Sequence, residues 1–320
     1  MTTHDRSAGA LLGTAAGDAL GVPYEFSTPI GPAQQAAMTG GGLGNFAPGE
    51  WSDDTAMAIS VARVAATGAD LRAVDALDAI ANGFLEWYDQ GPADIGNQTG
   101  AVLAATRKRL DRGETGPSRI MHEEAVTYTR YHAHSAGNGA VMRTAAVAWA
   151  FPDDREACAE AARTVAALTH ADPLAGDSCV LWSEAIRVAI ADGSIDVAAG
   201  LDLVPEERRE QWAGWLSDAS SPTHERVPGR RFSPNGYTVK AVQAAVAAIT
   251  QTVGVDQGHL AAALHAAVRI GDDTDTVAAI AGALLGARWG ASAVPQTWRA
   301  AVHGWPGLTA DGLVDLAPTH

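Results

Sequence analysis

One short stretch of the chain concentrates side chains that could bind a metal ion. Its carboxylates and hydroxyls belong to Asp272, Asp273, Thr274, Asp275 and Thr276. An uncharged, Ala-rich segment follows from Val277 to Ala287 and predicts a buried helix. Single acids at a helix N-terminus are ordinary, because they accept hydrogen bonds from its free N–H groups and complement its dipole. Three acids on so apolar a segment repel one another unless a cation lies between them, and clusters of oxygen ligands suit Mg²⁺, Mn²⁺ or Ca²⁺.

A second cluster of the same kind precedes another apolar helix. Ser52, Asp53, Asp54 and Thr55 are followed by AMAISVARVAA, as the first cluster is followed by VAAIAGALLGA. Either cluster alone could be a helix cap or a turn. If the two helices pack side by side, their N-termini place four or five carboxylates around one point. That arrangement suits a pair of Mg²⁺ or Mn²⁺ ions about 3.5–4 Å apart, able to orient a water molecule and polarise a substrate oxygen.

The N-terminal segment predicts a helix that another helix can approach closely. Glycine recurs at every fourth position from Gly9 to Gly17, which leaves one face without side chains, and the helix is expected to stop near Gly21. Asp18 lies close to that end, where a negative charge opposes the helix dipole unless another group holds it. Glu25 follows on a loop, from which it could reach a site or remain a solvated acid.

Two further stretches offer groups that could bind a substrate. Gly137, Asn138 and Gly139 form a turn that enters a predicted Ala-rich helix. Free N–H groups at a helix start can hold a phosphate, although the same residues also suit an ordinary turn. His170 lies between two predicted helices, where a packed or capping role is equally open. Asp94 precedes another helix and adds one more acid on a loop.

The elements that must position these residues are nearly all helices. Apolar residues recur at helical spacing throughout, and alternating strand patterns are almost absent, so we predict an all-α fold in a single domain. The expected helices cover 7–19, 54–67, 71–89, 98–111, 119–130, 139–149, 154–169, 174–192, 196–201, 205–217, 236–253, 257–269, 275–289 and 295–303. The longest irregular segments are expected at 27–50 and 218–235.

Composition narrows the classes of function. The 320 residues are 47% hydrophobic, which is enough for a sizeable core, and the net charge of -15 leaves no electrostatic footprint for nucleic acid as a partner. Cys158 and Cys179 lie in apolar surroundings, as reduced buried thiols do. The N-terminus lacks the basic and apolar regions of a signal peptide, and no segment predicts a membrane span. We therefore expect a cytoplasmic protein, and a monomer.

Seven motifs in chain order resemble the ADP-ribosylglycohydrolase family. They are LLGTAAGDALGVPYEF, WSDDTAM, DIGNQT, GNGAVMR, LTHADP, IGDDTDTVAAIAGALLGA and HGWPGL. The resemblance implies a compact orthogonal helical bundle over 1–320 with a binuclear Mg²⁺ or Mn²⁺ site. It also implies an enzyme that hydrolyses the bond between C1″ of ADP-ribose and an acceptor, usually a modified protein side chain.

The same resemblance implies roles for individual residues. The implied metal ligands are Ser52, Asp53, Asp54, Asp273, Asp275 and Thr276, and the implied substrate-binding residues are Ser135, Gly137, Asn138, Gly139, His170 and Gly96. Glu25 matches an acid on a flexible loop over the distal ribose. Asp94 matches the acid that arginine-directed bacterial members use near the anomeric carbon. Asp272 stands where many relatives have Gly and is not assigned to the metal.

We expect catalysis to involve Glu25, Asp94, Asp53 and Asp54, with Asp94 or Glu25 as general acid or base. ADP-ribosyl-arginine on a protein is the expected substrate. Serine-linked, nucleic-acid-linked and O-acyl ADP-ribose remain open alternatives, as does a non-catalytic ADP-ribose binder. The retained acids argue against the binder, because an acid cluster without a use costs stability.

Overall fold

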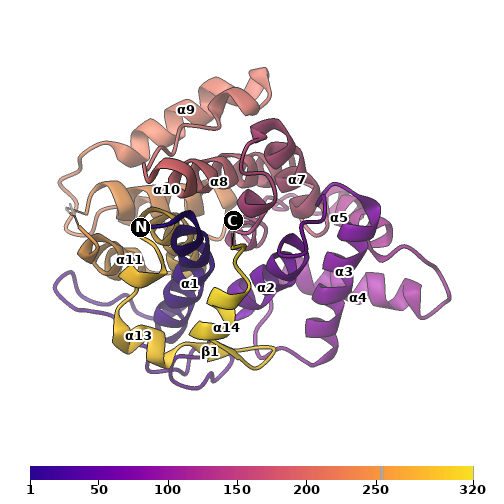
Figure 1. The fold of residues 1–320 in the computed structure, drawn as a ribbon, viewed down its shortest axis with the longest axis horizontal. Helices are drawn as coiled ribbons and strands as arrows, with labels where there is room; N and C mark the ends of the chain where they lie inside the picture. The colour runs from indigo at the N-terminus through magenta and orange to yellow at the C-terminus, as the bar shows by residue number, and fades with distance from the viewer. Residues whose placement is uncertain (253, 255, 320) are drawn as a thin grey trace.

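Helices make up almost all of the regular structure in the computed structural model, which describes residues 1–252, 254 and 256–319. The helices of the first part are α1 (Thr3–Gly21), α2 (Asp53–Ala65), α3 (Val74–Asp89), α4 (Asn97–Leu110), α5 (Pro117–Tyr131), α6 (Val147–Ala150), α7 (Arg155–Ala167) and α8 (Pro173–Asp192). Those of the second part are α9 (Glu206–Ser220), α10 (Thr238–Thr250), α11 (Gly258–Ile270), α12 (Thr274–Trp289), α13 (Gln296–Ala301) and α14 (Ala310–Asp315). The prediction of an all-α fold is confirmed (Figure 1).

Short elements complete the described chain. The 3-10 helices are η1 (Val22–Tyr24), η2 (Val141–Arg143), η3 (Leu201–Leu203), η4 (Arg230–Phe232) and η5 (Ala291–Ala293). The two strands, β1 (His303–Gly304) and β2 (Leu308–Thr309), pair antiparallel. The backbone N–H of Trp51 donates to the His303 carbonyl (3.0 Å), so the β1 region anchors the residue just before the Ser52 cluster.

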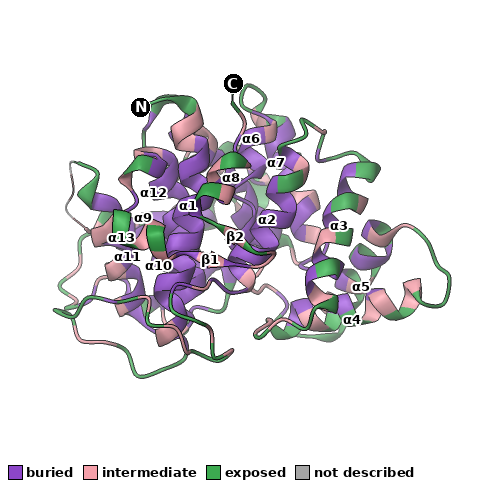
Figure 2. Ribbon diagram, turned by 60° about the horizontal axis from the view of Figure 1, so that its bottom comes forward, coloured by how far each residue is buried: buried purple, intermediate pink, exposed green. Residues whose placement is uncertain are grey.

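α1 and α12 form the centre of the molecule. Every residue of α1 from Ser7 to Gly21 is buried, and so is every residue of α12 from Thr274 to Ala287. A helix that is apolar on all sides must be covered on all sides, and α2, α8, α10 and α11 pack around this pair. Figure 2 shows the buried residues running along α1 and α2 in the middle of the view, while exposed residues lie on loops and outer faces.

The glycine spacing explains how α1 and α12 pack. A Cβ atom on Gly13 would lie 2.1 Å from the Gly282 carbonyl oxygen, and one on Gly286 would lie 1.8 Å from the Gly9 carbonyl oxygen. At the other end, a Cβ on Gly21 would lie 2.3 Å from the Asp275 Cα. The predicted close approach is therefore confirmed. Because the helices run antiparallel, it brings the end of α1 to the start of α12, where the acids lie.

We expect Gly13→Ala to lower the free energy of unfolding by about 3 kcal/mol, because the added methyl group meets backbone that cannot move alone. Urea denaturation measures the loss. Gly214→Ala in the exposed part of α9 is the matched control, since its Cβ would meet no atom within 4 Å. The control should gain about 0.5–1 kcal/mol from helix propensity. Equal stability of the two variants would contradict the packing argument.

Two predicted helices are wrong. Over 139–149 the chain forms η2 and the four-residue α6, because Gly137 pairs with Tyr237 in an antiparallel bridge and holds the preceding backbone extended. Over 196–201 the Asp196 carboxylate accepts the Ala198 N–H (3.0 Å), which forms a local turn in place of a helix.

The remaining predicted helices occur with ends shifted by a few residues, and α14 was not predicted. The predicted end of the 236–253 helix, Val253, lies outside the described residues, as does His320. Segment 27–50 is irregular as expected, whereas α9 and η4 extend into 218–235. Cys158 and Cys179 are buried free thiols. None of the described helices combines the length and apolar character that crossing a membrane requires.

Candidate active site

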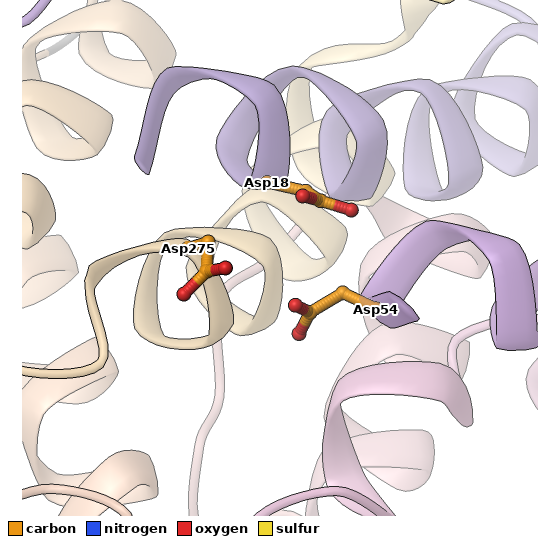
Figure 3. Close-up of side chains that lie close together, drawn as sticks. All are labelled: Asp18, Asp54 and Asp275. Carbon is orange, nitrogen blue, oxygen red and sulfur yellow. The ribbon is translucent and has the colours of Figure 1, made fainter. Parts of the chain in front are cut away.

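The starts of α2 and α12 meet at the end of α1, and their acids converge there. Carboxylate oxygens of Asp18, Asp54 and Asp275 lie within 4.8 Å of one another, and Figure 3 shows the three side chains directed toward a common space. A second group, formed by Glu25, Asp273 and Asp275, has the same spacing. Asp275 belongs to both groups. The predicted convergence of the two clusters is therefore present.

Hydroxyl groups lie among these carboxylates. Ser52 Oγ is 2.8 Å from an Asp18 oxygen, 3.1 Å from Asp54 and 3.4 Å from Asp275. A hydroxyl has one proton, so donation to the nearest partner leaves the Ser52 lone pairs facing the other two acids. Thr276 Oγ1 lies 3.4 Å from the same Asp54 oxygen.

The donor set fits one or more divalent cations. The second carboxylate oxygen of Asp54, Oδ1, is buried without a hydrogen-bond partner among the described residues. Buried polar atoms are rarely left unpaired unless an ion or a water molecule supplies the missing contact. Carboxylate and hydroxyl oxygens are hard ligands of the kind that Mg²⁺, Mn²⁺ and Ca²⁺ accept. The acid groups could therefore hold metal ions.

Asp18 has a different place in the cluster. Its carboxylate accepts the N–H and hydroxyl of Ser52 (2.9 and 2.8 Å) and those of Thr55 (3.0 and 2.6 Å). A carboxylate has about four acceptor positions, so these donors occupy all of them. Asp18 thus caps α2 from another helix, although sequence reasoning assigned it no role. Its unfavourable position at the end of α1 was the signal that something else holds it.

Two asparagines orient Asp273. The Asn138 amide donates to the Asp273 carboxylate (2.7 Å), and the Asn235 side-chain oxygen accepts the Asp273 N–H (3.0 Å). The Asn138 side chain therefore faces the acids. Asp272 turns away, with a positive φ of 61° and its carboxylate bonded to Ser233. Sequence reasoning missed Asn235, which lies in an irregular segment without a motif.

A cavity of about 430 Å³ opens above the acids, within the range of roughly 300–1,000 Å³ that is usual for ligand pockets. The predicted site residues that line it are Glu25, Asp53, Asp94, Gly96, Gly137, Asn138, Gly139, His170, Asp273, Asp275 and Thr276. Ser52 and Asp54 do not line the cavity but contact Asp275 and Thr276, which do. Ser135 does not line the cavity, because its hydroxyl donates to Asp172. The lining described here contains no Lys or Arg side chain.

His170 packs against the glycine turn. A Cβ on Gly137 would lie 3.1 Å from His170 Nε2, and one on Gly139 would lie 3.0 Å from Cε1. The missing side chains therefore make room for the ring, whose Nδ1 lies 2.8 Å from Thr169 Oγ1. Burial lowers the pKa of His170 to about 3, so the ring is neutral at physiological pH. No α-helix starts at this turn, which corrects the predicted phosphate site at a helix N-terminus.

A smaller cavity of about 160 Å³ lies beside the first. Asp53 and Asp94 line both cavities and therefore lie where the two adjoin. The rings of Phe46, Trp51, Trp87 and Trp305 line the smaller one, together with Glu50. Its described lining again includes acids and no Lys or Arg. Sequence reasoning missed this cavity.

Burial raises the pKa values of the acids in the cluster. The pKa of Asp18 is raised to about 6 and that of Asp53 to about 7, mainly by burial. Burial, followed by the charge of Asp273, raises the pKa of Glu25 to about 9. The pKa values of Asp54 and Asp275 are also well above their usual range, for the same reason and through mutual repulsion. A cation would relieve the repulsion in each case.

We expect the chelator-treated protein to lose thermal stability as the pH rises from about 7 to about 8.5. A carboxyl whose folded pKa exceeds its unfolded value stabilises the fold below the unfolded value and loses that contribution as the pH passes the folded one. Asp53, at about 7, and Glu25, at about 9, titrate around this window. His170 acts in the opposite direction, but only below its ordinary pKa of 6.5. Thermal unfolding with EDTA and with Mn²⁺ measures the effect.

In that experiment added Mn²⁺ should flatten the decline, because a cation binds the ionised form of the acids. A melting temperature that is constant or rises over the window in EDTA would contradict the prediction.

The sequence and the fold of this chain are similar to those of known proteins. The model of the ADP-ribosylglycohydrolase family matches residues 1–319. The ADP-ribosyl-dinitrogen reductase glycohydrolase of Rhodospirillum rubrum is 32% identical over 307 residues, which cover 93% of this chain and 90% of that protein. The ADP-ribosylarginine hydrolase Tri1 of Pseudomonas putida (strain GB-1) is 28% identical, over 92% of this chain and 73% of its own. A solved structure described as an ADP-ribosylglycohydrolase-related protein complex superposes with a TM-score of 0.69 and 26% identity, and covers 98% of this chain and 96% of its own.

Proposed function

The chain belongs to the ADP-ribosylglycohydrolase family, and from this premise we propose that it hydrolyses ADP-ribosyl-arginine on proteins in a reaction that depends on divalent metal. The observation that carries the proposal is the position of Asp275, whose carboxylate lies within 4.8 Å of those of both Asp54 and Asp273 at the floor of the larger cavity. Asp54 Oδ1, which has no hydrogen-bond partner in the part of the chain that the structure describes, supports the metal in particular.

We assign the metal to six residues on the two helix starts. They are Ser52, Asp53, Asp54, Asp273, Asp275 and Thr276, which would hold two Mg²⁺ or Mn²⁺ ions. When bound, such ions polarise a substrate oxygen and lower the pKa of a bound water molecule. Asp18 and Asn138 position the ligands: Asp18 accepts a hydrogen bond from the Ser52 hydroxyl, which leaves the Ser52 lone pairs toward the site, and Asn138 donates to Asp273.

The other lining residues bind and orient the ADP-ribose. The Gly137–Gly139 turn, with no side chains in the way, lets a diphosphate approach its backbone, and the neutral His170 ring behind it can share one hydrogen bond without adding charge. Glu25 closes the opposite side of the cavity. Its carboxyl group can accept a hydrogen bond from a ribose hydroxyl there. Binding energy gained at the diphosphate, away from the reacting bond, orients C1″.

The acceptor side of the site favours a guanidinium group. Asp94 lies on the wall between the two cavities, so a leaving group that departs past it enters the smaller one. There it meets aromatic rings and Glu50. Guanidinium groups stack on aromatic rings and pair with carboxylates in a two-pronged geometry, which an alcohol or a phosphate cannot do. The printed name of the Pseudomonas putida relative specifies the same linkage.

Release of ADP-ribose from defined conjugates tests the proposal. Arginine-, serine- and nucleic-acid-linked ADP-ribose and an O-acyl ester are each incubated with Mg²⁺, Mn²⁺ or EDTA. We expect rapid release from the arginine conjugate with either metal and none with EDTA. Preference for another conjugate would replace the acceptor assignment, release that persists in EDTA would remove the metal, and binding of ADP-ribose without any release would indicate a non-catalytic binder.

A further inference from the structure

Arg143 is a buried cation without a carboxylate partner. Its side chain is fully buried, and no ion pair between described residues includes it. Its guanidinium donates to the carbonyls of Gly139 (3.1 Å) and Val165 (3.3 Å), and it lies 4.6 Å from the centre of the Phe84 ring. The Nε–H has no partner among the described residues.

This arrangement is costly unless the charge has a use. Burial lowers the pKa of Arg143 to about 10, so the group still carries its charge at neutral pH. Moving an unpaired charge out of water costs several kcal/mol, as an order of magnitude, and two carbonyls and an aromatic face offset only part of it. An apolar side chain of similar length would avoid the cost.

The position of Arg143 suggests what the charge does. Gly139, whose carbonyl it holds, lines the larger cavity, and His170 packs on the same turn. Around that cavity the described lining contains five carboxylates and no Lys or Arg. The metal ions of the proposed site would offset the acids, but at the glycine turn neither a Lys or Arg of the described lining nor the neutral His170 supplies positive charge to a diphosphate. Arg143 lies on the side of the turn away from the cavity and is a fixed positive charge in contact with the Gly139 carbonyl.

We infer that Arg143 is a positioning residue for the diphosphate: it holds the Gly137–Gly139 turn by the Gly139 carbonyl and supplies, from behind the turn, the positive charge that the cavity wall lacks. The inference rests on the proposed function, because it takes the ligand to be ADP-ribose. The charge lies 3.1 Å from the Gly139 carbonyl in fully buried surroundings, where electrostatic interactions are stronger than in water. The same positive charge repels cations and so weakens metal binding nearby. The charge of Asp53 is one of the influences on the pKa of Arg143, which shows that the two groups interact.

Arg143→Met keeps an unbranched apolar stem that suits the buried position, and it removes the charge and the hydrogen bonds to the two carbonyls. Calorimetric titration with ADP-ribose should show affinity at least about tenfold weaker than that of the unaltered protein. Titration of the ligand-free protein with Mn²⁺ should show affinity that is equal or tighter, because a nearby positive charge is gone. A variant that merely damages the fold would weaken both. Arg6→Met is the control. Arg6 also donates to carbonyls and has an Nε–H without a partner among the described residues, but it contacts the end of α8, away from the cavity.

Arg143→Lys decides between charge and shape, and also replaces Arg143→Met if that variant does not fold. It keeps the charge and loses the planar fork, so we expect ADP-ribose affinity within about threefold of the unaltered protein. ADP-ribose affinity unchanged in Arg143→Met, or Arg143→Lys as weak as Arg143→Met, would overturn the inference alone. Absence of ADP-ribose binding by the unaltered protein would overturn the proposed function, and this inference with it.

Discussion

Asp275→Asn should lower the rate of ADP-ribose release by at least about a thousandfold, which corresponds to about 4 kcal/mol of transition-state stabilisation. Asp275 is the acid that belongs to both groups of three, so its loss affects every metal position that the two groups can form. The amide is nearly the same size as the carboxyl but carries no charge. Release assays at saturating Mn²⁺ measure the rate, and calorimetric titration with Mn²⁺ measures the loss of metal affinity directly.

The fold of this variant should be at least as stable as that of the unaltered protein in EDTA. Burial and the charges of Glu25 and Asp54 raise the pKa of Asp275, so removing its charge relieves repulsion in the metal-free state. Asp272→Asn is the matched control: the acid is three positions away, turned toward Ser233, and Asn tolerates its positive φ. We expect the control to keep its activity and Mn²⁺ affinity. An active Asp275→Asn, or an equally inactive Asp272→Asn, would refute the assignment of the metal.

The contrast between Asp272 and Asp275 shows how far the sequence predicts the site. Repulsion among neighbouring acids predicts that a cation is needed, and the repeated Asp-Asp-hydroxyl pattern predicts that α2 supplies the second half. Both expectations follow from local composition. The direction in which each carboxylate points depends on the backbone: Asp272 has a positive φ, and its carbonyl accepts a hydrogen bond from the distant Phe26 N–H. The motif alone does not predict that contact.

The same limit applies to the helices. The glycines of α1 predict a close approach because the spacing of four is a local property of one helix. The partner, α12, lies far along the chain, and only the fold pairs its Gly282 with Gly13. The role of Asp18 also depends on the fold, since the four hydrogen bonds that its carboxylate accepts come from Ser52 and Thr55 on a distant part of the chain.

Tertiary contacts also explain the predicted helix over 139–149 that does not form. Its Ala-rich composition favours a helix, but Gly137 is held by its bridge to Tyr237 and the Asn138 amide is bonded to Asp273. Arg143, which would be one polar residue on a helix face, turns into the interior. Likewise the aromatic cavity combines Trp51, Trp87 and Trp305 from separate elements, a grouping with no periodicity in the sequence.

Asp94→Asn tests whether that cavity receives the acceptor. We expect kcat/KM for arginine-linked ADP-ribose to fall about a hundredfold, because an ionised carboxylate that pairs with a desolvated guanidinium contributes roughly 2–5 kcal/mol. The affinity for free ADP-ribose should change by less than about twofold, since the product lacks the guanidinium. Asp94 is half-buried on the wall between the cavities, and the Ile95 N–H that it accepts (2.8 Å) can still bond to the amide oxygen of Asn.

Comparing turnover with the affinities for ADP-ribose and Mn²⁺ distinguishes a defect in acceptor recognition from general damage to the site. Mn²⁺ affinity should be retained, because Asp94 is not among the six residues assigned to the metal and lies in neither group of three acids. Asp111→Asn, at the exposed far end of α4, is the matched control and should behave as the unaltered protein does. If Asp94→Asn instead weakens ADP-ribose binding and arginine-linked turnover equally, Asp94 shapes the ribose site and the guanidinium assignment fails. If turnover is unaffected, the leaving group does not pass Asp94 at all, and the aromatic cavity is not where the arginine lies.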